Sequence, residues 1–179
     1  MLKDIQRVLL TEEQILNRIK EIGKNISSEY EGKDLLVVGI LKGSVMFTSE
    51  LLKNITIPCE MDFMAVSSYG SSSETSGVVR ILKDLDHGIE GKDVIIVKDI
   101  IDSGITLDYL LKYLKARRAN SIEIVTLLTK PSRRRVDVNV KYCGFEVPDE
   151  FLVGFGLDYN EKYRNLPYVG ILKEEVYKK

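Results

Sequence analysis

Two carboxylates and a turn of small residues follow an apolar run in the middle of the chain. Residues 94–97 are apolar without alternation, which predicts a strand covered on both faces. Asp99 and Asp102 come next, and residues 103–106 open a predicted helix. Backbone N–H groups and hydroxyls at a helix start bind phosphate, and Gly104 has no Cβ to block the approach. A carboxylate beside a cradle for one phosphate suits a ribose 5-phosphate, and the spacing matches neither a Walker A loop nor a GxGxxG fingerprint.

The composition excludes several other chemistries. The chain has 179 residues, with 26 basic and 27 acidic side chains and a formal charge of −1. Because His87 is the single histidine, a three-histidine zinc site and an HExxH helix are excluded, and acid–base chemistry falls to carboxylates or lysines. Cys59 and Cys143 form no CxxC pair and fit a reducing compartment.

We expect a soluble, cytoplasmic protein with neither nucleic acid nor membrane as a partner. The near-zero net charge argues against binding to a nucleic-acid backbone. No apolar run approaches the ~18 residues that cross a bilayer, and the first residues lack the apolar core of a signal peptide. The length suits one domain of ordinary size.

Strands of the buried type alternate with amphipathic helices along most of the chain. Thr11 and Gln14 form a predicted capping box, and the isoleucines after them recur at helical spacing. Further helices are expected at 44–53 and after Gly104, and strands at 35–41, 59–66, 78–83, 94–97 and 122–128. This alternation predicts an α/β fold with a mainly parallel sheet flanked by helices. Ligands bind at the carboxyl ends of the strands in such sheets.

Two segments depart from the alternation. Residues 67–77 are rich in serine and glycine and offer nothing to anchor in a core, which predicts a mobile loop. The last third of the chain has short predicted strands at 138–143, 151–155 and 168–172, between loops rich in Asp, Asn and Pro. We expect these strands to form a small antiparallel appendage.

Several separate segments resemble the type I phosphoribosyltransferase family and, within it, its hypoxanthine-guanine branch. The segments lie at 41–44, 67–70, 94–106, 130 and 151–164. Agreement at so many ordered sites is not expected by chance. The resemblance implies the type I phosphoribosyltransferase fold in a single domain over residues 1–179, with a small hood built from the chain termini. It also implies a lid loop at about 67–77 and a purine-binding hood segment at about 138–179.

The resemblance assigns much of the site to the substrate phosphoribosyl pyrophosphate (PRPP). The residues implied for pyrophosphate are Leu41, Lys42, Gly43 and Arg164, and the 41–42 peptide bond is often cis in the family. The residues implied for ribose 5-phosphate are Lys98, Asp99, Asp102, Ser103, Gly104, Ile105 and Thr106. Ser68 and Tyr69 are implied to belong to the lid, which closes over the site and excludes water.

The resemblance places the purine beside Asp102. It implies that Asp102 is the general base near purine N7 and that Lys130 donates to the 6-oxo group. An adenine amino group would leave that ammonium unpaired, and a site built for one hydrogen bond rejects such a replacement by roughly 10⁴-fold or more. Phe151 is implied to stack on the base beside the backbone of Leu152, and Asp158 to meet the purine edge.

The implied reaction is displacement of pyrophosphate from C1 of PRPP by N9 of hypoxanthine or guanine, giving IMP or GMP in purine salvage. Mg²⁺ on the pyrophosphate is the implied cofactor, with Asp99 and Asp158 as the implied metal-binding residues. The implied partners are these small molecules and further copies of the chain, in a homodimer or homotetramer paired near the pyrophosphate loop.

Lys98 departs from the family pattern, which has two adjacent acids at this point. The positively charged Lys98 stands where the family has the first acid, beside the ribose diol and the metal, so Asp99 is the one acid of the pair. We expect Lys98 to weaken Mg²⁺ binding there, and Lys98→Glu to improve the apparent affinity for Mg²⁺ or for PRPP.

Less specific interpretations stand beside these. Taken alone, Asp102 is more often a helix N-cap and Phe151 more often a core residue. Lys130 with the arginines after it is more often a solvated loop or a nucleic-acid patch, and we assign Arg133 and Arg135 to surface or subunit contacts. One functional alternative is a non-enzymatic regulator that keeps the fold and senses PRPP or nucleotide while binding nucleic acid or protein. Another is a transferase that prefers xanthine or accepts any 6-oxopurine. The chain has the general base Asp102, the purine-binding Lys130 and the lid loop, and together these favour an enzyme.

Overall fold

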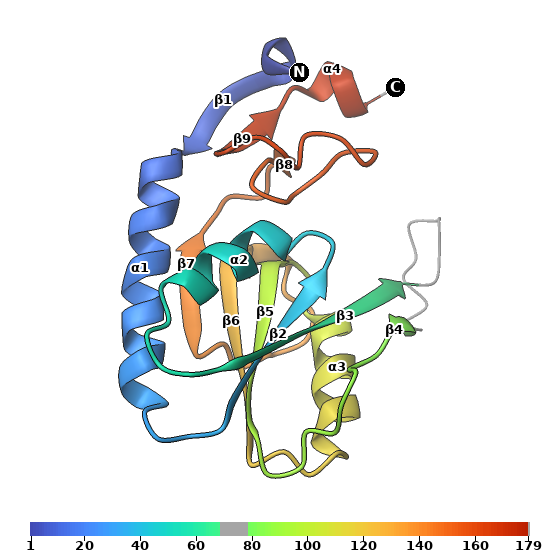
Figure 1. Cartoon of the computed structure of the whole chain (residues 1–179). Helices are drawn as coiled ribbons and strands as arrows, with labels where there is room; N and C mark the ends of the chain where they lie inside the picture. Colours follow the sequence, from blue (N-terminus) through green and yellow to red (C-terminus); the bar gives the residue numbers. More distant parts are fainter. Residues whose placement is uncertain (69–78, 179) are drawn as a thin grey trace.

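A six-stranded sheet forms the centre of the computed structural model, which describes residues 1–68 and 79–178 (Figure 1). The strand order is β4-β3-β2-β5-β6-β7. The strands are Leu35–Leu41 (β2), Glu60–Ser68 (β3), Val79–Lys83 (β4), Asp93–Ile101 (β5), Ser121–Thr129 (β6) and Tyr142–Glu146 (β7). Neighbouring strands are parallel except β3 and β4, which are antiparallel. The predicted α/β fold with a mainly parallel sheet is confirmed.

Helices cover both faces of this sheet. The longer ones are α1 (Glu12–Glu29), α2 (Val45–Lys53) and α3 (Ile105–Lys115). Val37 and Ile95 lie in the core that α1 and α2 complete, whereas Val38 and Ile96 lie in the core that α3 completes. Adjacent residues of β2 and β5 therefore enter opposite cores, which explains apolar runs without alternation. Among the described residues, no helix has the length and apolar character that crossing a membrane requires.

The segment 138–143 is not a strand as a whole, contrary to the prediction. Val138 and Val140 pack into the core beneath α3. Strand pairing begins only with Tyr142, which lies opposite Val125 of β6. β7 is parallel to β6 and extends the main sheet, so this segment does not belong to the appendage. Val138 and Val140 alternate with exposed residues, because an irregular segment lying along a core can bury every second side chain, as a strand does.

The second sheet is a hood built from both ends of the chain (Figure 1). Its order is β1-β9-β8, with antiparallel pairing, and its strands are Ile5–Leu10 (β1), Val169–Leu172 (β9) and Leu152–Val153 (β8). The predicted antiparallel appendage and its origin in the chain termini are confirmed. The predicted strand 151–155 ends early because Gly154, Phe155 and Gly156 all have positive φ, which turns the chain.

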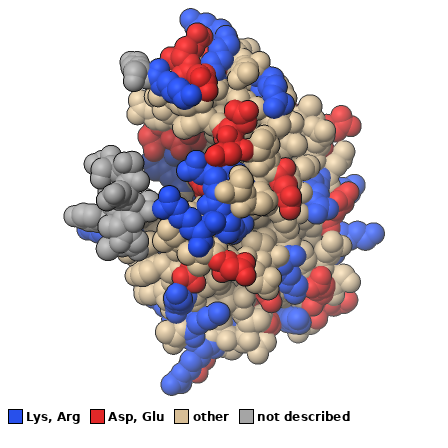
Figure 2. Space-filling model, turned by 180° about the vertical axis from the view of Figure 1, so that it is seen from behind, with Lys and Arg blue, Asp and Glu red and all other residues tan. Residues whose placement is uncertain are grey.

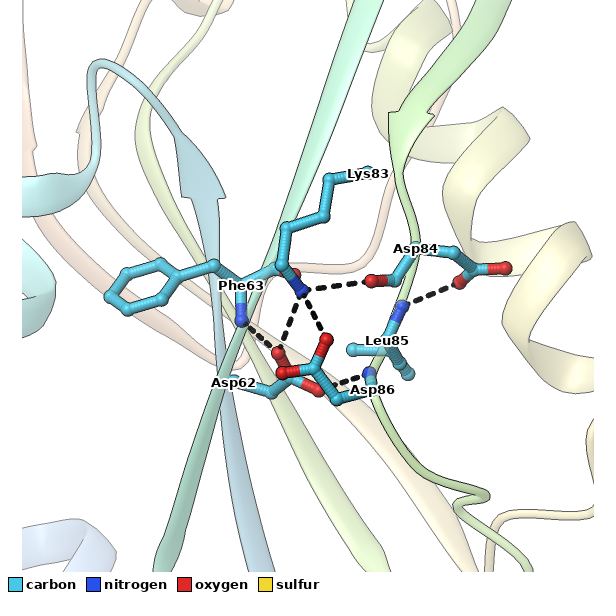
Figure 3. Close-up of polar contacts among 6 residues, drawn as sticks. All are labelled: Asp62, Phe63, Lys83, Asp84, Leu85 and Asp86. Carbon is cyan, nitrogen blue, oxygen red and sulfur yellow. Dashed lines mark hydrogen bonds and ion pairs between the residues drawn. The ribbon is translucent and has the colours of Figure 1, made fainter.

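A cluster of charges fastens the edge strand β4 to β3 (Figure 3). The Lys83 ammonium, at the end of β4, lies 3.1 Å from Asp62 Oδ1 and 3.0 Å from Asp86 Oδ1. The backbone N–H groups of Phe63 and Asp86 donate to Asp62 at 2.6 and 2.8 Å. Burial on its own raises the pKa of Asp62, but these N–H groups and the ammonium outweigh it, so the pKa lies below its ordinary value.

Candidate active site

The first cleft lies where β5 meets α3. β5 runs further than predicted and ends at Ile101, so Lys98 and Asp99 lie within the strand. Gly104 has a φ of 84°, and a Cβ there would lie 2.8 Å from the Val136 carbonyl oxygen, so the turn requires glycine. The cleft has a volume of about 220 Å³, and its lining includes Lys98, Asp102, Ser103, Gly104 and Thr106. Most residues predicted for ribose 5-phosphate meet here, and Ile105 begins α3 beside them.

A second cleft lies between the strand ends and the hood. Its volume is about 260 Å³, and it is lined by Asp99, Ile100, Asp102, Lys130, Phe151, Leu152, Leu157 and Asp158. The lining contains every residue predicted for the purine and for the metal. Asp102 lines both clefts, so the predicted base site and the predicted phosphate cradle share one wall.

The loop after β2 reaches this site through its backbone. The peptide bond between Leu41 and Lys42 is cis, as predicted. A Cβ on Gly43 would lie 1.7 Å from Asp99 Oδ2, and a Cβ on Gly156 would lie 2.0 Å from the Gly43 carbonyl oxygen. The Gly43 backbone is therefore packed between Asp99 and the hood, and a side chain at position 43 would require the Asp99 side chain to move.

Glu161 pairs with both cations predicted for pyrophosphate. Its carboxylate lies 2.9 Å from Lys42 Nζ and 3.3 Å from an Arg164 nitrogen. The hydrogen bond from Lys42 is the main cause that lowers the pKa of Glu161. Arg164 also lies 2.9 Å from Asp158 and donates to the Gly156 carbonyl oxygen at 2.7 Å. Sequence reasoning missed Glu161, since nothing in its local pattern distinguishes it from a surface acid.

Lys130 is held by the segment that leads into the hood. Its Nζ donates to the Glu150 carbonyl oxygen at 2.8 Å and lies 3.4 Å from Asp149 Oδ1. Its side chain is only 11% exposed, so the solvated-loop interpretation does not describe it. Arg133 donates through Nε to Asp102 Oδ1 at 2.7 Å and through NH1 to Asp149 at 3.4 Å. Arg133 lies at the surface, as predicted, with its side chain 50% exposed, and the short helix at Pro131–Arg133 turns it toward Asp102.

Phe151 packs in the core of the hood and also lines the second cleft. Its ring stacks on Tyr177 at a centroid distance of 4.6 Å and meets Tyr159 edge to face at 5.5 Å. It also lines the second cleft beside Leu152, the first residue of β8. The core and the stacking interpretations of Phe151 are compatible, since its neighbours fix the plane of the ring.

Lys98 pairs with Asp99, the residue next to it on β5. Asp99 is also the carboxylate against which Gly43 packs. Asp99 and Asp158 both line the second cleft, and each already has a cationic partner, Lys98 or Arg164. The described residues hold no group of three or more acidic, histidine or cysteine side chains that suits a metal. Oxygen ligands from one or two carboxylates fit a Mg²⁺ ion that is bound mainly through substrate phosphates and water.

Charges of both signs lie together over the surface as well. On the face in Figure 2, Lys and Arg side chains gather near the middle with Asp and Glu side chains beside them, and the surface there is hollowed. Of the predicted lid, Ser68 ends β3, whereas Tyr69 and residues 70–77 lie outside the described residues.

The chain has a mainly parallel sheet with a turn and a helix after β5, and a hood beside the strand ends. This places it in the class of α/β proteins whose ligand sites lie at the carboxyl ends of the strands. The phosphoribosyl transferase domain family matches residues 7–160. The chain belongs to the phosphoribosyltransferase family.

Relatives of known name agree over the whole chain. The hypoxanthine-guanine phosphoribosyltransferase of Bacillus subtilis is 54% identical over 177 residues, which cover 99% of this chain and 98% of the relative. A crystal structure of a hypoxanthine phosphoribosyltransferase from Staphylococcus aureus superposes with a TM-score of 0.97 at 54% identity, and covers 100% of this chain and 97% of that one. The bifunctional protein TilS/HprT of Listeria monocytogenes is 53% identical over 99% of this chain, which spans only 27% of that longer protein.

Proposed function

We propose that the chain is a purine salvage enzyme that transfers the 5-phosphoribosyl group from PRPP to N9 of hypoxanthine or guanine. The products are IMP or GMP and pyrophosphate. The observation that carries the proposal is the second cleft, where Asp102, Lys130 and Phe151 face one space with Asp99 and Asp158. The named relatives at 54% identity support the same activity.

Lys130 selects the purine base, and Asp102 accepts a proton from it. The contacts with Glu150 and Asp149 hold the Lys130 ammonium in place, so it presents a donor that a 6-oxo group satisfies and a 6-amino group does not. As N9 forms its bond to C1 of the ribose and the C1–O bond to pyrophosphate breaks, the proton on N7 passes to the Asp102 carboxylate. Phe151 supplies the stacking surface, and the backbone of Leu152 lies beside the base edge.

The phosphates of PRPP take the two remaining parts of the site. The 5-phosphate binds Ser103, Gly104, Ile105 and Thr106 at the start of α3, beside Lys98 and Asp99. Pyrophosphate binds the backbone of Leu41 and Gly43 together with Lys42 and Arg164. Because Glu161 pairs with both of these cations, it orients them in the free protein and releases them to the stronger anion.

Mg²⁺ completes the proposed chemistry. Asp99 and Asp158 would hold a Mg²⁺ ion together with the substrate, and the ion would neutralise charge on the leaving pyrophosphate. The proposal further assigns the exclusion of water to a lid around Ser68 and Tyr69. It takes residues 1–179 as one phosphoribosyltransferase domain with its purine-binding hood segment at about 138–179, acting in the cytoplasm as a homodimer or homotetramer.

The test is release of pyrophosphate from PRPP and Mg²⁺ with hypoxanthine, guanine, xanthine or adenine as the acceptor. We expect turnover with hypoxanthine and guanine and none above background with adenine. Turnover mainly with xanthine would replace the proposed substrates. Absence of turnover with every base, in protein that binds PRPP by calorimetry, would favour a non-enzymatic regulator.

A further inference from the structure

Arg133 joins the candidate base to the candidate purine selector through a shared acid. Its Nε lies 2.7 Å from Asp102 Oδ1, and its NH1 lies 3.4 Å from both carboxylate oxygens of Asp149. Lys130 Nζ lies 3.4 Å from Asp149 Oδ1 as well. The order of contacts is therefore Asp102, Arg133, Asp149 and Lys130.

The backbone fixes the place of Arg133. Before it, the Lys130 N–H donates to the Ile101 carbonyl oxygen at 3.0 Å. After it, the N–H groups of Arg135 and Val136 both donate to the Ser103 carbonyl oxygen, at 2.9 and 3.1 Å. The segment that carries Arg133 is thus hydrogen-bonded on both sides, to the end of β5 and to the turn after it, so the guanidinium approaches Asp102 from a defined direction.

The guanidinium occupies one oxygen of Asp102 and leaves the other for a ligand. Arg133 bonds to Oδ1, and no described residue donates a hydrogen bond to Oδ2. A charge-assisted bond of this kind fixes the plane of the carboxylate. Oδ2 is then the oxygen that accepts the N7 proton of a purine in the second cleft.

This ion pair is poorly placed to stabilise the fold. The side chains of Arg133 and Asp102 are 50% and 47% exposed, and pairs that face water contribute little to folding. A purine bound over the pair would remove that water and strengthen the interaction. The contact therefore has its main effect in the liganded state.

We propose that Arg133 is a positioning residue for Asp102, and that Asp149 holds Arg133 and Lys130 in a fixed relation. The proposal rests on the proposed function and adds to it a residue that acts through the general base, Asp102. Removal of the guanidinium leaves Asp102 free to rotate away from N7, whereas the groups proposed to hold the 5-phosphate, at the turn after Asp102 and the start of α3, stay in place.

The first test compares Arg133→Gln and Arg133→Lys with the control Arg135→Ala, whose side chain is exposed on the same segment. We expect Arg133→Gln to lower kcat/KM for hypoxanthine about tenfold to hundredfold, mostly in kcat, since a 1 Å misplacement costs about that much. KM for PRPP and the melting temperature should stay close to those of the unchanged protein. Arg133→Lys should recover part of the loss, and Arg135→Ala should show none. Equal or faster turnover in Arg133→Gln would overturn the proposal.

A double-mutant cycle with Asp102→Asn tests whether Arg133 acts through Asp102. We expect Arg133→Gln to have little further effect when Asp102 is already replaced. The same fold-loss in both backgrounds would exclude the positioning role. If the unchanged protein turns over no base, the proposed function fails, and the cycle is then read from GMP affinity by calorimetry. If Arg133→Gln lowers the GMP affinity only in protein that retains Asp102, the inference is supported. If it lowers the affinity equally in the Asp102→Asn protein, the inference is contradicted.

Discussion

Lys98 carries a charge opposite to the one expected beside a ribose diol and a metal. Its ammonium pairs with Asp99, the carboxylate that borders Gly43 and the second cleft. The contact satisfies Lys98, but it occupies an oxygen that a divalent cation would use. The effect of Lys98 is therefore exerted through Asp99.

We predict that Lys98→Glu raises the apparent affinity for Mg²⁺, for PRPP or for both, by about tenfold, because a competing cation is replaced by an additional oxygen ligand. Mg²⁺ titrations of activity and calorimetric titration with PRPP measure the change. Lys115→Glu alters the net charge equally on the exposed end of α3 and serves as the control. Equal apparent dissociation constants for Mg²⁺ and PRPP in the original and Lys98→Glu proteins would contradict this prediction.

A second prediction at this scale concerns base selection. Lys130→Met removes the donor to the 6-oxo group, so we expect kcat/KM for hypoxanthine to fall by about a hundredfold or more. The ratio of kcat/KM for hypoxanthine to that for adenine should become much smaller. Steady-state kinetics with both bases measure this ratio. Lys112→Met, at a position 75% exposed on α3, should leave it unchanged. Retention of full discrimination in Lys130→Met would show that another group selects the base.

At the scale of elements, the loop after β2 is held by close backbone packing. A Cβ on Gly43 would lie 1.7 Å from Asp99 Oδ2, whereas a Cβ on Gly88 would meet nothing within 4 Å. We predict that Gly43→Ala lowers kcat/KM by about a hundredfold through displacement of the loop and of Asp99, and that Gly88→Ala is neutral. Kinetics with PRPP as the varied substrate test this, and a functional Gly43→Ala protein would show that the loop can shift.

The β3–β4 edge has its own prediction, about stability and pH. Asp62→Asn removes the ion pair with Lys83 and weakens the acceptor of two backbone N–H groups, so we expect a loss of about 1–2 kcal/mol near neutral pH. Because the folded-state pKa of Asp62 is lowered, its contribution is complete above an unfolded pKa of about 4 and is lost as pH falls below that value. Urea unfolding at neutral and acid pH measures both. A difference between the two proteins that does not shrink in acid would contradict the assignment.

At the scale of the whole molecule, the site lies between the main sheet and the hood. Lys130 follows β6 and Asp99 lies on β5, whereas Phe151 and Asp158 belong to the segment that builds the hood. A ligand in the second cleft therefore joins two parts of the fold that share few strand contacts. It binds the folded chain and not the unfolded one.

We predict that GMP at about one hundred times its dissociation constant raises the melting temperature by about 5–10 °C, from a stabilisation of about 2.7 kcal/mol. Scanning calorimetry with and without the nucleotide measures the shift. AMP is the matched control, because its 6-amino group does not satisfy Lys130, and its shift should be smaller. Equal shifts with both nucleotides would show that the phosphate cradle alone holds them.

Local patterns were enough to predict most of the fold. The capping box at Thr11, the doubly buried runs of β2 and β5 and the helix after Gly104 all appear where the sequence indicated them. They could be predicted because neighbouring residues alone determine the signal. The segment 138–143 could not, because burial along a core and burial in a strand give the same alternation.

The residues of the candidate site were likewise marked by the sequence, but their contacts were not. The sequence by itself determined which carboxylates, lysines and glycines follow which strand, and thus the class of ligand that we propose. Only the tertiary structure decided that Arg133 meets Asp102, that Glu161 meets Lys42, and that a side chain at position 43 would require Asp99 to move. These contacts join residues far apart in the chain, and their distances depend on how the hood and the loops pack on the sheet, which no local pattern encodes.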